Sequence, residues 1–237
     1  MNINGYLDYI KTPWGRLFYR LVWYNLQFKD KKILDFGSGF GVTANHLAEC
    51  NHVTAVEPNE EMFEHRICDN HYEQMMGSIG KLKELEDGSF DVILCHNVLE
   101  YVEERGELMA EFHRLLKKDG VLSIVKHNKA GKVMHKAVFE NNIDEAMSLL
   151  SGENAVSQNF GTINEYETEE LREYIAGKFT LDKVGGIRTF FGIQPNSFKS
   201  EPDWEDRMFA LECAVENNPT YANVAFFQHL ILSKSES

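Results

Sequence analysis

Short apolar segments alternate with helical patterns over the first 125 residues of the chain. Each apolar segment is bounded by turn residues, which is typical of strands that are buried on both faces. Helical patterns begin near Gly41, Glu60 and Glu104, between the apolar segments. Alternation of this kind predicts an α/β fold with a doubly wound, mostly parallel sheet that has helices on both faces. The predicted strands are 33–36, 53–56, 74–76, 92–95 and 121–125.

The second half of the chain adds two strands, and two helical segments lie outside the strands and helices described so far. Strand patterns at 180–184, continuing into 187–191, and at 224–232 bring the predicted sheet to seven strands. The helical segments are an N-terminal one over 6–28, with Pro13 suited to a helix start, and an insert over 128–166. Ligands of open α/β sheets bind at the carboxyl ends of the strands. We therefore expect a single domain over 1–237, in which the N-terminal helix and the insert cover the site. Helices are predicted at 132–140, 143–150 and 203–217.

A glycine-rich turn follows the first predicted strand. Asp35 precedes glycines at 37, 39 and 41, and Glu57 ends the second strand. Glycine lets a backbone bend sharply or approach a ligand closely, and the helix that follows offers unpaired N–H groups to an anion. The Glu57 carboxylate can accept hydrogen bonds from both hydroxyls of a ribose. The sequence therefore predicts a nucleoside-containing cofactor.

The spacing of the glycines bears on which cofactor this is. The dinucleotide pattern G-x-G-x-x-G fails when it starts at Gly37, because residue 42 is valine, and it ends on Ala44 when it starts at Gly39. Alanine is tolerated at that last position, so a nicotinamide cofactor stays open. Asp35 would repel a pyrophosphate but suits an α-amino group. This favours a nucleoside that carries an amino acid.

The run Asp-x-Gly-x-Gly-x-Gly over 35–41 resembles motif I of the class I S-adenosylmethionine (SAM) methyltransferases, and Glu57 is similar to their ribose-binding acid. Residues 87–100 resemble the fourth-strand region of that family, and 117–122 the turn into its fifth strand. The resemblance implies a Rossmann-like methyltransferase fold with SAM as the cofactor. It implies a cofactor site made of Asp35, Gly37, Ser38, Gly39, Glu57, Pro58, Met62, Ser78, Ile79 and His96.

Shorter motifs through nearly the whole chain resemble one subgroup, the tRNA 5-carboxymethoxyuridine methyltransferases. The matching pieces are Trp23, His96 with 98–100, 121–123 with Asn128, 134–135, 142–144, 186–190 and 218–221. This resemblance implies that the methyl acceptor is a carboxylate on a modified wobble uridine of tRNA. The chain departs from the subgroup at Phe18, where the subgroup has an arginine, and in the insert, where Asn, Asp, Glu and Ser largely replace basic residues.

Three residues are the candidates for catalysis: His96, Arg16 and Arg188. His96 follows the fourth strand and is either a general base or a structural or cofactor-contacting residue. A carboxylate acceptor is already ionised and needs only a cation to position it, which an arginine fork supplies. Two alternatives remain: a small-molecule O- or N-methyltransferase with His96 as the base, and a non-catalytic SAM-binding module.

Net charge and cysteine content limit the kinds of partner that the protein is expected to have. The net charge is −13, from 37 acidic and 24 basic residues, which disfavours a general nucleic-acid binder but leaves room for a local basic face. The four cysteines form no C-x-x-C pair, so we expect reduced thiols and no metal site. No apolar run reaches the length of a membrane span, and the polar first five residues lack a signal-peptide core. We expect a cytoplasmic protein that acts on a small molecule or tRNA; the sequence does not predict its oligomeric state.

Overall fold

The structure is a computed structural model that describes residues 3–152, 156–157, 161–162, 164 and 166–235. It divides into two compact units. The helical unit comprises residues 1–26, 126–167 and 184–229, and the sheet unit comprises residues 27–125, 168–183 and 230–237. The predicted insert, 128–166, belongs to the helical unit, and its residues 153–155, 158–160, 163 and 165 lie outside the described residues.

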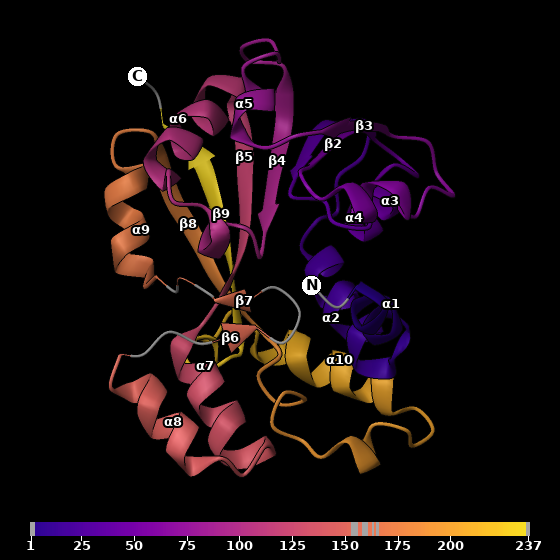
Figure 1. The fold of residues 1–237 in the computed structure, drawn as a ribbon, viewed down its shortest axis with the longest axis vertical. Coiled ribbons are helices and arrows are strands. Elements are labelled where there is room, and N and C mark those ends of the chain that lie inside the picture. Colours follow the sequence, from indigo (N-terminus) through magenta and orange to yellow (C-terminus); the bar gives the residue numbers. More distant parts are fainter. Residues whose placement is uncertain (1–2, 153–155, 158–160, 163, 165, 236–237) are drawn as a thin grey trace. The chain divides into compact units, whose positions relative to one another are not determined.

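The sheet unit is organised around a seven-stranded sheet in the order β3-β2-β1-β4-β5-β9-β8. The pairs from β3 through β5 are parallel, whereas Figure 1 shows the β9 arrow pointing opposite to β4. The seven predicted strands are therefore confirmed, and the sheet is mixed. The strands are β1 (Lys32–Phe36), β2 (His52–Glu57), β3 (Glu73–Met76), β4 (Phe90–His96), β5 (Leu116–His127), β8 (Phe179–Ile187) and β9 (Phe227–Lys234).

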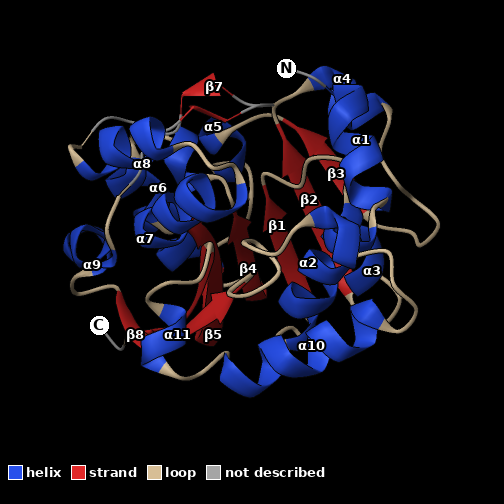
Figure 2. Ribbon diagram, turned by 90° about the horizontal axis from the view of Figure 1, so that it is seen from below, coloured by secondary structure: helices blue, strands red, loops and turns tan. Residues whose placement is uncertain are grey.

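Helices cover both faces of the strands in the sheet unit. Figure 2 shows α5 and α6 on one side of the strands and α3 on the other. Ile33, Leu34, Ile93 and Leu94 are fully buried between these layers, which is why β1 and β4 read as continuous apolar runs instead of alternating ones. Each such side chain contributes about 1.5–3 kcal/mol of burial free energy. The helices are α3 (Val42–Leu47), α4 (Glu60–Glu64), α5 (Ile79–Leu82), the 3₁₀ turn η1 (Leu99–Tyr101), α6 (Arg105–Leu115) and α9 (Thr168–Ile175).

The helical unit holds most of the remaining helices. Its N-terminal segment is two helices instead of one, because Pro13 has no N–H and Thr12 is extended, with its hydroxyl accepting the N–H of Gly15. None of the helices within the described ranges is long and apolar enough to cross a bilayer. The elements are α1 (Ile3–Lys11), α2 (Pro13–Tyr24), α7 (Lys129–Met134), the π-helical η2 (His135–Phe139), α8 (Ile143–Leu150), the antiparallel pair β6 (Val156–Ser157) and β7 (Gly161–Thr162), η3 (Asn196–Phe198), α10 (Trp204–Val215) and α11 (Pro219–Ala222).

The predicted strand over 187–191 is wrong beyond Ile187. Arg188 takes a left-handed backbone conformation, with φ of 65°. The Glu212 carboxylate accepts the backbone N–H groups of residues 189, 190 and 191 at 2.9, 2.8 and 3.1 Å. These amides therefore bind a side chain on α10 instead of a neighbouring strand. The last strand also begins later than predicted, at Phe227, because residues 224 and 225 donate to the Tyr221 carbonyl at the end of α11.

Gly41 is a position where only glycine fits, for both conformational and steric reasons. It caps α3 with φ of 70°, and a Cβ added there would overlap the Tyr72 hydroxyl. That hydroxyl donates to the Ile67 carbonyl at 2.7 Å.

We predict that Gly41→Ala lowers the free energy of unfolding by about 2–4 kcal/mol, since it adds backbone strain and displaces a buried hydrogen bond. Gly88→Ala is the matched control: Gly88 also has a positive φ, of 58°, but open space where a Cβ would lie. It should cost about 1 kcal/mol, the strain alone. Urea unfolding measures both variants, and equal losses would contradict the steric part of the argument.

Candidate functional site

The turn after β1 is held in shape by β2. Backbone N–H groups of Gly37 and Ser38 donate to the Val56 carbonyl at 2.8 and 3.2 Å. The N–H of Gly39 donates to the Glu57 carboxylate at 2.7 Å. The glycine turn is therefore preorganised by hydrogen bonds to the second strand, with one of them made by a predicted site residue.

Glu57 organises the loop on its other side as well. Its second oxygen accepts the N–H of Asn59 at 2.8 Å, and the Asn59 side chain accepts the N–H of Met62 at 2.9 Å, which starts α4. Glu57 is buried, and burial raises the pKa of its carboxyl while the two amides oppose the rise. Each carboxylate oxygen keeps a second lone pair for a ligand hydroxyl. Met62 is buried on the same side of the turn, beside Gly39.

Asp35 is a buried carboxyl whose pKa departs strongly from its usual value. It is 4% exposed, and its Oδ2 has no hydrogen-bond partner among the described residues. Burial, followed by the negative charge of Glu57, raises the pKa of the Asp35 carboxyl to about 7. A backbone hydrogen bond at Ala44 opposes part of this rise. A buried carboxylate with one unpartnered oxygen still costs folding free energy, and an ammonium group placed against it would reduce that cost. This fits the α-amino group that the sequence predicts as its ligand.

Two further buried oxygens at this edge of the sheet lack hydrogen-bond partners within the described ranges. They are the Ser38 hydroxyl and the Asn97 side-chain oxygen. β4 pairs with β1 in parallel, so Asn97, directly after β4, lies at the same end of the strands as Asp35. Our sequence analysis did not name Asn97 as a candidate. The sequence signal is an asparagine directly after an apolar strand, since asparagine is favoured at left-handed positions, and the structure gives Asn97 a φ of 55°.

His96 ends β4 and contacts the neighbouring strand. Its Nε2 lies 2.9 Å from the hydroxyl of Ser123 on β5, which is fully buried. Removal from water lowers the pKa of His96 to about 3. The imidazole is therefore neutral at pH 7 and weakly basic. This geometry favours a positioning role over general-base catalysis.

The remaining predicted cofactor residues follow β2 and β3. Glu57 pairs with Met76 at the last position of the β2–β3 ladder, so Pro58, Ser78 and Ile79 lie at the same edge of the sheet. Pro58 and Ser78 are exposed, and Ile79 is partly buried. All predicted cofactor residues thus come together within the sheet unit; their role in binding stays a prediction.

The two candidate arginines lie in the helical unit and differ in what they bind. Arg16 pairs with Glu205 at 2.9 Å and donates to the Lys11 carbonyl at 2.7 Å, so its guanidinium is already engaged. The Arg188 guanidinium makes no hydrogen bond to any described residue and packs over the ring of Phe226, 4.2 Å from its centroid. Arg188 is thus the better candidate for holding an anion.

The pKa of Asp35 predicts a distinctive pH dependence. Because its folded pKa of about 7 lies above the unfolded value near 4, the folded protein binds this proton more tightly than the unfolded chain. Stability of the cofactor-free protein should therefore fall as the pH rises from about 4 to about 7, by a few kcal/mol for this group.

The asparagine side chain of Asp35→Asn cannot ionise, so the variant should not lose free energy of unfolding as the pH rises from about 4 to about 7. Relative to wild type it should therefore become more stable over this pH range. Asp69→Asn, which changes an exposed carboxylate, is the control and should show no such gain. Urea unfolding at pH 5 and pH 8 measures the effect. Parallel pH profiles for Asp35→Asn and wild type would contradict it.

Comparison with known proteins agrees with this geometry. Residues 34–124 match the family model described as a methyltransferase domain. Thiol S-methyltransferase TMT1B from Rattus norvegicus and the protein of the same name from Mus musculus are each 30% identical over 115 residues, which is 43% of this chain and 47% of each relative. The chain thus matches about half the length of these curated relatives.

Solved structures resemble nearly the whole chain. A SAM-dependent methyltransferase from Thermotoga maritima, described as a possible histamine N-methyltransferase, has a TM-score of 0.65 at 19% identity, covering 99% of this chain and 97% of that one. A SAM-dependent methyltransferase from Mesorhizobium loti has a TM-score of 0.58 at 15% identity, covering 86% of this chain and 91% of that one. The chain therefore has the fold of the SAM-dependent methyltransferases, with a match to the methyltransferase domain over residues 34–124.

Proposed function

We propose that this protein is a SAM-dependent methyltransferase whose cofactor binds at the carboxyl ends of β1, β2 and β4. One observation carries the proposal: Asp35 presents a buried, unpartnered carboxylate oxygen beside a glycine turn that is held by Glu57. SAM has both an amino-acid end and a ribose, so Asp35 pairs with its ammonium group and Glu57 accepts its ribose hydroxyls. The Ser38 hydroxyl and the backbone of the glycine turn complete the contacts to the amino-acid end.

The other predicted residues bind the adenine side of the cofactor. Met62 is buried beside Gly39, and a thioether packs well against an aromatic ring. Pro58, Ser78 and Ile79 follow β2 and β3 and border the same side. This assignment leaves the end of β4, with His96 and Asn97, for the reactive end of the cofactor.

The acceptor we propose is a carboxylate. Bound SAM supplies an electrophilic methyl group on a positively charged sulfur. The protein's part is to align the acceptor oxygen and to exclude water. A carboxylate is ionised at pH 7 and needs no base, which agrees with the pKa of about 3 that burial imposes on His96. An amine or alcohol acceptor would need a stronger base than this histidine.

For the identity of the acceptor, we propose that the carboxylate belongs to a modified wobble uridine of tRNA. It rests on the resemblance of the chain to the tRNA 5-carboxymethoxyuridine methyltransferases. The net charge of −13 weighs against extensive contacts to phosphates, so binding would depend on a local basic face. A small-molecule carboxylic acid is the alternative acceptor within the same chemistry.

The test is methyl transfer from isotope-labelled SAM to tRNA from cells that lack this gene, followed by nucleoside digestion and mass spectrometry. We expect label on the wobble-uridine carboxylate as a methyl ester. Asp35→Asn should lose transfer together with SAM affinity, measured by calorimetry. No label in a preparation that binds SAM would contradict the tRNA proposal and direct the search to small acids. A protein that does not bind SAM would contradict the function itself.

His96→Ala separates the positioning role from general-base catalysis. We predict that transfer to a carboxylate falls by less than about 100-fold and that its pH profile between about 6 and 8 is unchanged, because loss of a general base would cost 10²–10⁴-fold. The assay uses the acceptor found in the tRNA experiment or in a panel of small acids. A loss of methyl transfer larger than about 100-fold would favour an amine or alcohol acceptor. So would a pH profile of the wild-type transfer rate with an inflection near pH 6.5 that disappears in the variant.

A further inference from the structure

A buried lysine and a partly buried arginine lie near each other within the helical unit. Lys199 follows η3 and is 3% exposed, and Arg188 follows β8 and is partly buried, with its Nε fully removed from solvent. The two charges are close enough that Arg188 adds to the effect of burial in lowering the pKa of Lys199, to about 8. Buried like charges repel, so this arrangement needs an explanation.

Aromatic rings frame the pair. The Lys199 ammonium lies 4.9 Å from the ring centroid of Phe139 and 5.5 Å from that of Trp14. The Arg188 guanidinium lies 4.2 Å from the centroid of Phe226. Ring faces attract cations and partly offset the loss of water, but they accept no conventional hydrogen bonds. The donors of both side chains therefore stay available.

The hydrogen bonds made by the pair are few. Lys199 donates to the Asn196 side-chain oxygen at 2.9 Å, and within the described ranges its ammonium has no other hydrogen bond. Arg188 donates none to those residues. An ammonium carries three N–H donors and a guanidinium five, so most of them have no acceptor among the described residues.

The neighbouring acids are engaged elsewhere. The Glu212 carboxylate accepts three backbone N–H groups that follow Arg188. Glu140 pairs with Lys136 at 2.8 Å and lies 3.3 Å from Nε2 of His135. His135 adds no charge at pH 7, because burial and then Arg188 lower its pKa to about 4, and its ring is fixed by a hydrogen bond to the Gly192 carbonyl. Glu212 and Glu140 attract the Arg188 charge through space and oppose the lowering of its pKa by burial. Neither Arg188 nor Lys199 has a carboxylate within salt-bridge distance among the described residues.

We propose that Arg188 and Lys199 form an anion-binding subsite within the helical unit that takes a carboxylate or a phosphate through charge-assisted hydrogen bonds. The Arg188 fork binds two oxygens side by side, and the Lys199 ammonium binds one of them from a second direction. Anion binding at this subsite does not depend on the proposed function. The subsite selects its ligand by charge, because a neutral ligand would leave the unused donors of Arg188 and Lys199 without a charged acceptor.

The experiment uses the full chain without SAM and two probes, sodium acetate and inorganic phosphate, at constant ionic strength. Melting temperature and tryptophan fluorescence report binding, since Trp14 adjoins Lys199. Wild type should melt at a higher temperature as either anion is added. Lys199→Met should weaken binding about tenfold or more, whereas Lys199→Arg, which keeps the charge, should stay within about threefold of wild type.

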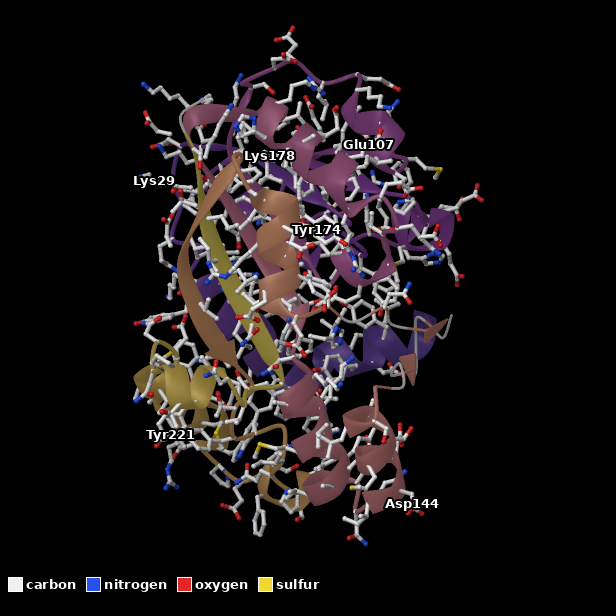
Figure 3. The ribbon with its side chains drawn as sticks, turned by 90° about the vertical axis from the view of Figure 1, so that its left-hand side faces the viewer. Lys29, Glu107, Asp144, Tyr174, Lys178 and Tyr221 are labelled. Carbon is white, nitrogen blue, oxygen red and sulfur yellow. The ribbon has the colours of Figure 1, made fainter. Side chains whose placement is uncertain are left out.

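Lys29→Met is the matched control, because Lys29 is exposed and stands at the periphery of the molecule in Figure 3. It should bind both anions like wild type. Without anions, Lys199→Met should melt at the wild-type temperature or above it, because it removes an uncompensated buried charge. A structural lysine would instead give a lower melting temperature and no change in anion affinity.

Two results would overturn the subsite: a wild-type protein that responds to neither anion, or a Lys199→Met variant that binds them as wild type does. A preference for acetate identifies a carboxylate as the recognised group, and a preference for phosphate identifies a phosphate. Anion binding without any methyl transfer would contradict the proposed function while leaving the subsite standing.

Discussion

The Glu57 carboxylate is the interaction on which the candidate cofactor site depends. It holds the glycine turn through Gly39 and the start of α4 through Asn59. Because it is buried close to Asp35, it also adds to the burial effect that raises the pKa of that carboxyl to about 7. One side chain thus shapes the loop, positions a helix and makes its neighbour favour a cationic ligand. A preorganised site of this kind needs little rearrangement when its ligand binds.

Both units bury ionisable groups that keep unused hydrogen-bonding capacity. Asp35 in the sheet unit has one carboxylate oxygen without a partner, and Lys199 in the helical unit makes one side-chain hydrogen bond, among the described residues. Each arrangement lowers the stability of the ligand-free protein, because a buried ion without a partner loses its hydration. Such groups are favoured where a ligand supplies the missing charge. The proposed function assigns an ammonium group to Asp35, and the proposed subsite in the helical unit takes an oxyanion.

The strands were predictable because both faces of the central sheet are covered, so that Ile33, Leu34, Ile93 and Leu94 stand in continuous apolar runs. Prediction failed where a distant side chain replaced a local partner. Residues 188–191 have strand-like composition, yet their amides bind Glu212 on α10. Backbone N–H groups at the edge of a strand can donate to any nearby acceptor, and the sequence pattern does not show which acceptor that will be.

The sequence by itself determined the α/β fold, the glycine turn with Asp35 and the acid at the end of β2, because these depend on local order along the chain. Tertiary structure alone decided the ionisation of Asp35 and His96, which depends on burial among residues from several elements. It also decided that Arg16 is engaged by Glu205 while Arg188 and Lys199 keep unused donors. Charges and hydrogen bonds act through space, so their outcome becomes readable only when distant segments of the chain are brought together.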